Sequence, residues 1–253
     1  MTHRQLSTAI AALAMILAAS RWGSAQSTFS VDPLLIKLNA ASNNAVLTLS
    51  NTSANDLRFE IKGFAWDQEP ISGTMQLTAT TDLVIFPPLV TLKAHSTQRI
   101  RVGATAAQGT VEKAYRLLIE ELPSEVKPAN ANQVNVRTRI GVPVFVEPTK
   151  STLSGKIDSV TIANHIVSVA LANTGTTHAM VDSIVIRGMS GPDQPVFEES
   201  LPGWYVLAGK TRTWQYTFKP AQCRPMKFVE VEVYAHDKML SSRADVPAGA
   251  CAP

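Results

Sequence analysis

The stretch that decides the fold is Gln133–Pro148, which reads QVNVRTRIGVPVFVEP. Apolar or β-branched side chains stand at every second position: Val134, Val136, Thr138, Ile140, Val142, Val144 and Val146. This period of two predicts a strand with one apolar face and one polar face. The run exceeds the roughly ten residues of a usual strand, and a long β-branched strand at a sheet edge is a template for another chain. We therefore expect it either to be covered within its own domain or to bind a second protein.

The first 25 residues have the composition of a secretory signal. His3 and Arg4 precede the apolar run 6–19, and the small residues Gly23 and Ala25 suit cleavage after position 25. The apolar run is shorter than the roughly 20 residues that a membrane-spanning helix needs, which argues against the alternative of a membrane anchor. The mature chain is then 26–253, a length that suits two domains of about a hundred residues each.

Charge and cysteine content narrow the class of protein further. Without Arg4 and Arg21, the 23 basic residues fall to 21, against 20 acidic residues, so nothing favours a nucleic-acid or anionic-membrane partner. Cys223 and Cys251 are an even pair in an exported chain and predict one structural disulfide in the second domain. Two free thiols are the alternative.

Short alternating runs separated by Asn, Ser, Gly and Pro indicate an all-β protein without a sustained helix. The runs expected as strands before the opening stretch are Phe29–Leu38 (interrupted by Pro33), Ala45–Leu49, Arg58–Trp66, Leu83–Phe86, Leu89–Leu92, Gln98–Val102 and Tyr115–Leu122. Those expected after it are Ile157–Ile162, Ile166–Asn173, Val181–Arg187, Tyr205–Leu207, Thr213–Phe218 and Phe228–Ala235. Pro148–Ser151 is the predicted boundary, so we expect one β-sandwich over 26–148 and a second over 149–253.

A catalytic function finds little support. The five histidines lack metal-ligand spacing, and the four of the mature chain are expected at the surface: His3 lies in the signal segment, and the others are His95, His165, His178 and His236. No HExxH, CxxC or GxSxG pattern occurs, and Gly203–Thr211 departs from a phosphate-binding loop because five residues, not four, separate its glycines. We expect no catalytic residue, no metal and no cofactor.

Several separate motifs together resemble one known family. They are Phe29-Ser30-Val31-Asp32-Pro33, Leu47–Asn51, Phe86-Pro87-Pro88, Gln98–Val102, Tyr115-Arg116-Leu117 with Glu120–Pro123, and Pro143–Pro148. The chain is similar to the periplasmic chaperones of the chaperone–usher pathway, and most similar to the archaic or alternative branch. The resemblance is strong over 29–148 and weaker beyond it.

This resemblance implies two immunoglobulin-like domains set at an angle like a boomerang, with a cleft between them. Such a chaperone binds and folds pilus or fimbrial subunits by donor-strand complementation: it lends an edge strand to an incomplete subunit and delivers the subunit to an outer-membrane usher. The lent strand would be 133–147, with Val134, Val136, Thr138 and Ile140 as the subunit-binding residues. The resemblance implies a periplasmic location, no ATP, and no embedding in a membrane.

The chain also departs from the family pattern. The family anchors the subunit's terminal carboxylate with an arginine and a lysine, and Leu35 and Pro143 stand at those positions. An arginine fork suits a carboxylate, so four arginines are candidate anchors: Arg101, Arg116, Arg99 and Arg139. Glu147 stands where the family's interdomain salt bridge needs a base, so that bridge should be absent or reversed.

Two other functions are compatible with the composition. A secreted two-domain adhesin or structural module would share the sandwiches and the signal, but would have no folding client. An exported hydrolase would need a nucleophile and a base, and no motif supplies them.

Overall fold

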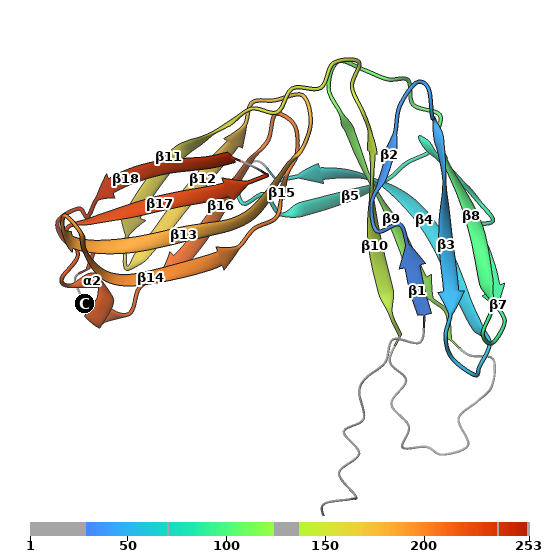
Figure 1. Ribbon diagram of the computed structural model, residues 1–253, viewed down its shortest axis with the longest axis horizontal. Coiled ribbons are helices and arrows are strands. Elements are labelled where there is room, and N and C mark those ends of the chain that lie inside the picture. Colours follow the sequence, from blue (N-terminus) through green and yellow to red (C-terminus); the bar gives the residue numbers. More distant parts are fainter. Residues whose placement is uncertain (1–28, 70, 124–136, 237, 252–253) are drawn as a thin grey trace, which may run out of the picture.

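The computed structural model describes residues 29–69, 71–123, 137–236 and 238–251 of this chain. Nearly all of its regular structure is β-strand, arranged as two sandwiches that lie at an angle to one another (Figure 1). The predicted fold class is therefore confirmed. The predicted boundary at Pro148–Ser151 falls between the end of β10 at Val146 and the start of β11 at Gly155.

The first sandwich packs a four-stranded layer against a six-stranded layer. The four-stranded layer has the order β1 (Phe29–Asp32), β3 (Asn44–Asn51), β8 (Thr97–Ala104) and β6 (Leu83–Phe86). The six-stranded layer has the order β2 (Ile36–Leu38), β10 (Arg139–Val146), β9 (Lys113–Glu121), β4 (Leu57–Gln68) and β5 (Met75–Ala79), with β7 (Leu89–Leu92) also on β4. Leu47, Ile100, Leu117 and Val144 are fully buried between the layers, as their alternating positions predict.

The second sandwich has a three-stranded and a five-stranded layer. The three-stranded layer has the order β11 (Gly155–Ala163), β12 (Ile166–Asn173) and β16 (Thr211–Thr217). The five-stranded layer has the order β14 (Gln194–Pro202), β13 (Ala179–Gly191), β17 (Phe228–Ala235) and β18 (Lys238–Asp245), with β15 (Tyr205–Val206) also on β13. A single turn of helix, α2 (Pro220–Cys223), carries Cys223, and a disulfide joins it to Cys251 as predicted.

Three strands were not expected from the sequence. They are β5, β14 and β18, and most of their residues are exposed or half-buried. Pro33 does interrupt the first run, and its two halves lie in different layers: β1 pairs with β3, whereas β2 pairs with β10.

The two domains meet through an apolar cluster flanked by hydrogen bonds. Trp66 and Phe145 of the first domain pack with Leu207 of the second. The side chain of Gln68 donates to the Tyr205 carbonyl at 2.8 Å and accepts from the Leu207 N–H at 2.9 Å. Because these contacts use both ends of one amide, they fix β4 against β15 and the residue that follows it.

His178 corrects the expectation that the histidines lie at the surface. Its side chain is only 9% exposed and stacks on Phe145 with ring centroids 3.8 Å apart. Its Nδ1 lies 2.8 Å from Glu112 Oε1, so an interdomain pair does exist. Glu147 takes no part in that pair, since its carboxylate accepts from Asn39 Nδ2 at 3.2 Å within the first domain.

Candidate functional site

β10 is bordered by another strand along only part of its length. It pairs with β9 from Arg139 to Val146, but parallel β2 covers only Val144–Val146 on the other side. Within the described residues, Arg139–Pro143 thus have a strand on one side alone. Unpaired backbone groups of this kind form a template for an added strand.

Two hydrogen bonds show which backbone groups of β10 face the open side. The Thr138 carbonyl accepts from Glu121 N–H at 3.0 Å on the β9 side, whereas Glu147 N–H donates to the Leu38 carbonyl at 2.8 Å on the β2 side. Since backbone groups alternate along a strand, the odd-numbered residues face the open edge. Arg139 and Gly141 each present an N–H and a C=O there, and Pro143 presents a carbonyl only.

The side chains of β10 divide between two faces. Val142, Val144 and Val146 are buried in the first domain's own core, and Ile140 is half-buried against the same core. Thr138 is exposed. Of the predicted subunit-binding residues, Val134 and Val136 lie outside the described residues.

The opposite face of β10 meets Arg116, which lies opposite Pro143 in the pairing with β9. A Cβ at Gly141 would stand 3.0 Å from the Arg116 Nε, so the missing side chain gives the guanidinium room beside the strand. The Arg116 Cζ lies 4.8 Å from the ring centroid of Trp66 and 5.8 Å from the ring centroid of Trp204, which belongs to the second domain. Arg116 therefore stands where the two domains face each other, beside the open part of β10.

The electrostatics of Arg116 distinguish it from an ordinary surface arginine. Burial lowers its pKa, against a weaker opposing effect of Tyr205, although the group stays protonated in proteins. Its Nη1 is buried and has no hydrogen-bond acceptor among the described residues. The Trp66 Nε1 is also buried and also has no hydrogen-bond acceptor among the described residues. A ligand that carries acceptor oxygens would satisfy donors that the described protein leaves unsatisfied.

The other candidate arginines have different surroundings. Arg99 and Arg101 lie on β8, in the other layer, and are exposed on its outer face because the alternate residues Ile100 and Val102 are buried. Arg139 is exposed and its Nη2 lies 2.8 Å from Glu120 Oε2. The structure thus separates the four candidates, and it brings only Arg116 into contact with both domains.

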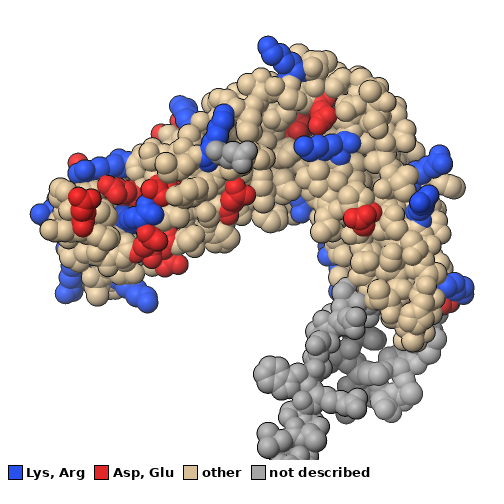
Figure 2. Space-filling model, viewed as in Figure 1, with Lys and Arg blue, Asp and Glu red and all other residues tan. Residues whose placement is uncertain are grey.

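Leu35 and Pro143, which stand at the family's anchor positions, are both removed from solvent at least in part. Leu35 is half-buried against the interdomain cluster, and Pro143 is buried within β10. Figure 2 shows the hollow between the two lobes on which this face of the first domain opens.

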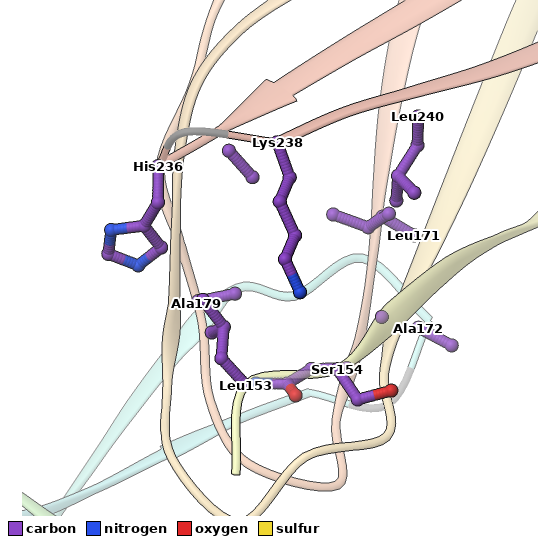
Figure 3. Close-up of a pocket in the computed structure, with 11 residues that line it drawn as sticks. Leu153, Ser154, Leu171, Ala172, Ala179, His236, Lys238 and Leu240 are labelled. Carbon is purple, nitrogen blue, oxygen red and sulfur yellow. The ribbon is translucent and has the colours of Figure 1, made fainter.

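A pocket of about 160 Å³ lies elsewhere, in the second domain between β12 and β18. Leu153, Leu171 and Leu240 line it, and the Lys238 side chain points toward Leu153 and Ser154 (Figure 3). The described part of the chain contains no cluster of three or more potential metal ligands. It also contains no helix long and apolar enough to cross a membrane.

The fold and this edge define a class: a two-domain β-sandwich protein with a one-sided strand beside the interdomain contact. Residues 28–152 match the family model of the pili and flagellar-assembly chaperones, PapD N-terminal domain. Residues 28–152 therefore belong to the pilus-assembly chaperone family, and the resemblance seen in the sequence is confirmed for them. A comparison with the sequences of curated proteins returned no match.

Solved structures of several chaperones share the fold of most of this chain. A chain of the CsuC–CsuE chaperone–tip adhesion subunit pre-assembly complex, from the archaic chaperone–usher Csu pili of Acinetobacter baumannii, has a TM-score of 0.60 and 19% identity, covering 86% of this chain and 98% of that chain. A chain of the complex of Salmonella enterica SafA pilin with the SafB chaperone has a TM-score of 0.56 and 14% identity, and the match covers 87% of this chain and 97% of that chain. The Pseudomonas aeruginosa CupB2 chaperone has a TM-score of 0.52 and 14% identity, and the match covers 86% of this chain and 100% of that chain.

Proposed function

We propose that this pilus-assembly chaperone binds pilus or fimbrial subunits in the periplasm by donor-strand complementation and passes them to an outer-membrane usher. The observation that carries the proposal is the one-sided edge of β10 beside Arg116. A subunit strand added at this edge would find the N–H and C=O groups of Arg139 and Gly141 free for pairing. Residues 1–25 would direct export.

Side-chain specificity would come from the residues that precede and begin β10. Val134, Val136, Thr138 and Ile140 continue the apolar parity of the strand, and we propose that they fill the groove of the incomplete subunit. Burial of three Val or Ile side chains contributes roughly 5–9 kcal/mol before the cost of ordering the segment. The half-burial of Ile140 against its own domain makes it the last donor residue before the core begins.

Arg116 is the proposed anchor for the terminal carboxylate of the subunit. It adjoins the open edge, its Nη1 lacks an acceptor, and burial strengthens the interaction of a guanidinium with an anion. Arg99 and Arg101 lie on the other layer, and Arg139 already pairs with Glu120. One half-buried arginine would thus replace the cations that are missing at Leu35 and Pro143.

The membership of residues 28–152 in a chaperone family argues against the alternative of a secreted adhesin or structural module. The same membership gives no support to a hydrolase. The usher is proposed as the receiving partner because one of the similar structures comes from an archaic chaperone–usher system.

The test is a pull-down of tagged protein from the periplasm of cells that express its neighbouring genes, with mass spectrometry of the bound proteins. Wild type and Arg101→Ala should recover a small sandwich subunit, because Arg101 is exposed on the far layer. Arg116→Ala should recover at least tenfold less, as expected when one partner of a buried charge pair is removed. Equal recovery by Arg116→Ala and wild type would reject the anchor, and recovery of no subunit by wild type would reject the chaperone function.

A further inference from the structure

The second domain contributes a side chain to the surroundings of Arg116. Trp66 belongs to β4 in the same sheet, but Trp204 comes from the second domain, between β14 and β15. The guanidinium carbon lies within cation–π distance of both indoles, at 4.8 Å and 5.8 Å. Trp66 is 4% exposed, whereas Trp204 is 37% exposed and forms the outer of the two aromatic contacts.

The backbone around Trp204 is held firmly against β13. The Val181 N–H donates to the Trp204 carbonyl at 3.1 Å, and the Gly203 N–H donates to the Asp182 carbonyl at 3.0 Å. A Cβ at Gly203 would stand 1.9 Å from the Val181 oxygen, so only glycine permits this approach. The Trp204 indole is in edge contact with Tyr205, with ring centroids 5.8 Å apart. These contacts give the indole a defined position opposite the first domain.

Contact with indole faces stabilises a desolvated guanidinium without using its hydrogen-bond donors. The five N–H groups of arginine lie in the plane of the group, whereas an aromatic face interacts from above or below that plane. If a carboxylate of the same protein held the arginine, those N–H groups would already be engaged in hydrogen bonds and could not bind a ligand. Arg116 is held by rings instead, and its Nη1 has no acceptor among the described residues.

We propose that Trp204 is a positioning residue for the carboxylate anchor, so that the anchor is completed by the second domain. The inference rests on the proposed function of Arg116. Trp204 orients the guanidinium with its donors free and excludes water from one side, which strengthens the charge-assisted hydrogen bonds to a terminal carboxylate. The second domain thereby takes part in recognising the end of the subunit.

The probe is a synthetic peptide of alternating threonine and valine, made once with a free C-terminal carboxylate and once as the C-terminal amide. The full chain, as wild type, Trp204→Ala, Trp204→Phe or Arg116→Ala, is titrated with each form, and the preference for the acid is the ratio of the two affinities. Tyr234→Ala is the matched control, because Tyr234 is also 37% exposed but lies on β17 and hydrogen-bonds to Glu232.

Wild type and Tyr234→Ala should prefer the acid equally. Trp204→Ala should reduce that preference about three- to tenfold, the size of a partly desolvated cation–π contact, with unchanged affinity for the amide. Trp204→Phe should restore most of the preference, which a general loss of folding would not allow. An unchanged preference in Trp204→Ala, with Arg116→Ala losing it, would overturn the role of Trp204 alone. A wild type without any preference would overturn the Arg116 anchor and this inference together, and a peptide that binds in neither form would overturn the docking edge.

Discussion

The last strands of the two domains, β10 and β18, differ in the chemistry of their edges. β10 reads RIGVPVFV, and its central and final residues are buried. β18 reads KMLSSRAD, pairs with β17 alone, and has no fully buried residue. Lys238, Arg243 and Asp245 on β18 are exposed, and charged edges of this kind discourage pairing with other chains. The comparison shows that one domain protects its terminal edge while the other leaves an apolar strand open.

The largest contrast between the strands should come from a carboxylate placed in each. Val144→Asp would bury an unpaired charge at a fully buried position and should lower the free energy of unfolding by more than about 4 kcal/mol. Met239→Asp on β18, at a half-exposed position, should change it by less than about 0.5 kcal/mol. Guanidinium chloride unfolding followed by circular dichroism measures both, and similar midpoints for the two variants would contradict the comparison.

The disulfide should separate the stabilities of the two domains. Cys223 and Cys251 close a loop of sequence separation 28 in the second domain, and such a link stabilises by roughly 2–4 kcal/mol. The double substitution to serine should lower the melting transition of the second domain in calorimetry. The transition of the first domain should stay in place, and an equal fall of both transitions would show that the domains unfold as one unit.

Blocking the open edge should reduce binding with little effect on folding. Arg139→Pro removes an N–H that faces the open side, so binding of a subunit or of the threonine–valine peptide should fall about tenfold. Arg139→Ala keeps that N–H and removes only the exposed ion pair with Glu120, which contributes at most about 1 kcal/mol. Titration of both variants with the peptide distinguishes the two causes. Equal losses of affinity in Arg139→Pro and Arg139→Ala would assign the loss to the ion pair and not to the missing N–H.

The smallest predicted effect concerns pH and the contact between the domains. Lys210 Nζ of the second domain lies 2.7 Å from Asp67 Oδ1 of the first. Burial alone would raise the pKa of Asp67, but hydrogen bonds from Lys210 and from the Gln68 N–H outweigh it and lower the pKa below its ordinary value. A lowered pKa in the folded state means that this stabilisation is present above about pH 4 and is lost as the pH falls through the lower value.

Both partners of this pair are partly exposed, so the contribution should stay below about 1 kcal/mol. The free energies of unfolding of wild type and of Asp67→Asn, compared between about pH 5 and pH 2, isolate the contribution of the Lys210–Asp67 pair. Parallel pH profiles of the two proteins would show that the pair contributes nothing.

The sequence predicted the strands that bury every second residue, and it missed three edge strands, β5, β14 and β18, in which no residue is fully buried. Alternation identified β3, β8, β9 and the described part of β10, because their inward side chains are apolar. It could not identify β14 and β18, because strands at a sheet edge hold their places by backbone pairing while most of their side chains meet water.

The site was only partly predictable for a related reason. Arg101 and Arg116 both stand on the outward face of an alternating strand, and the sequence does not say what that face meets. Arg101 meets solvent, whereas Arg116 meets Trp204 of the other domain. The burial of His178 depends likewise on Phe145, which is distant in sequence and lies across the domain contact.

Pro143 gives the docking edge a fixed end. It faces the open side without an N–H, at the point where β2 begins to cover the strand, and it lies opposite Arg116. Gly141, two residues earlier, is the last residue of this edge that can donate a backbone hydrogen bond to a guest strand, and it adjoins the Arg116 guanidinium that we propose to hold the carboxylate. If Arg116 holds that carboxylate as we propose, the final residue of the client sets the register of pairing, and a client longer by one residue at that end would turn every side chain to the wrong face.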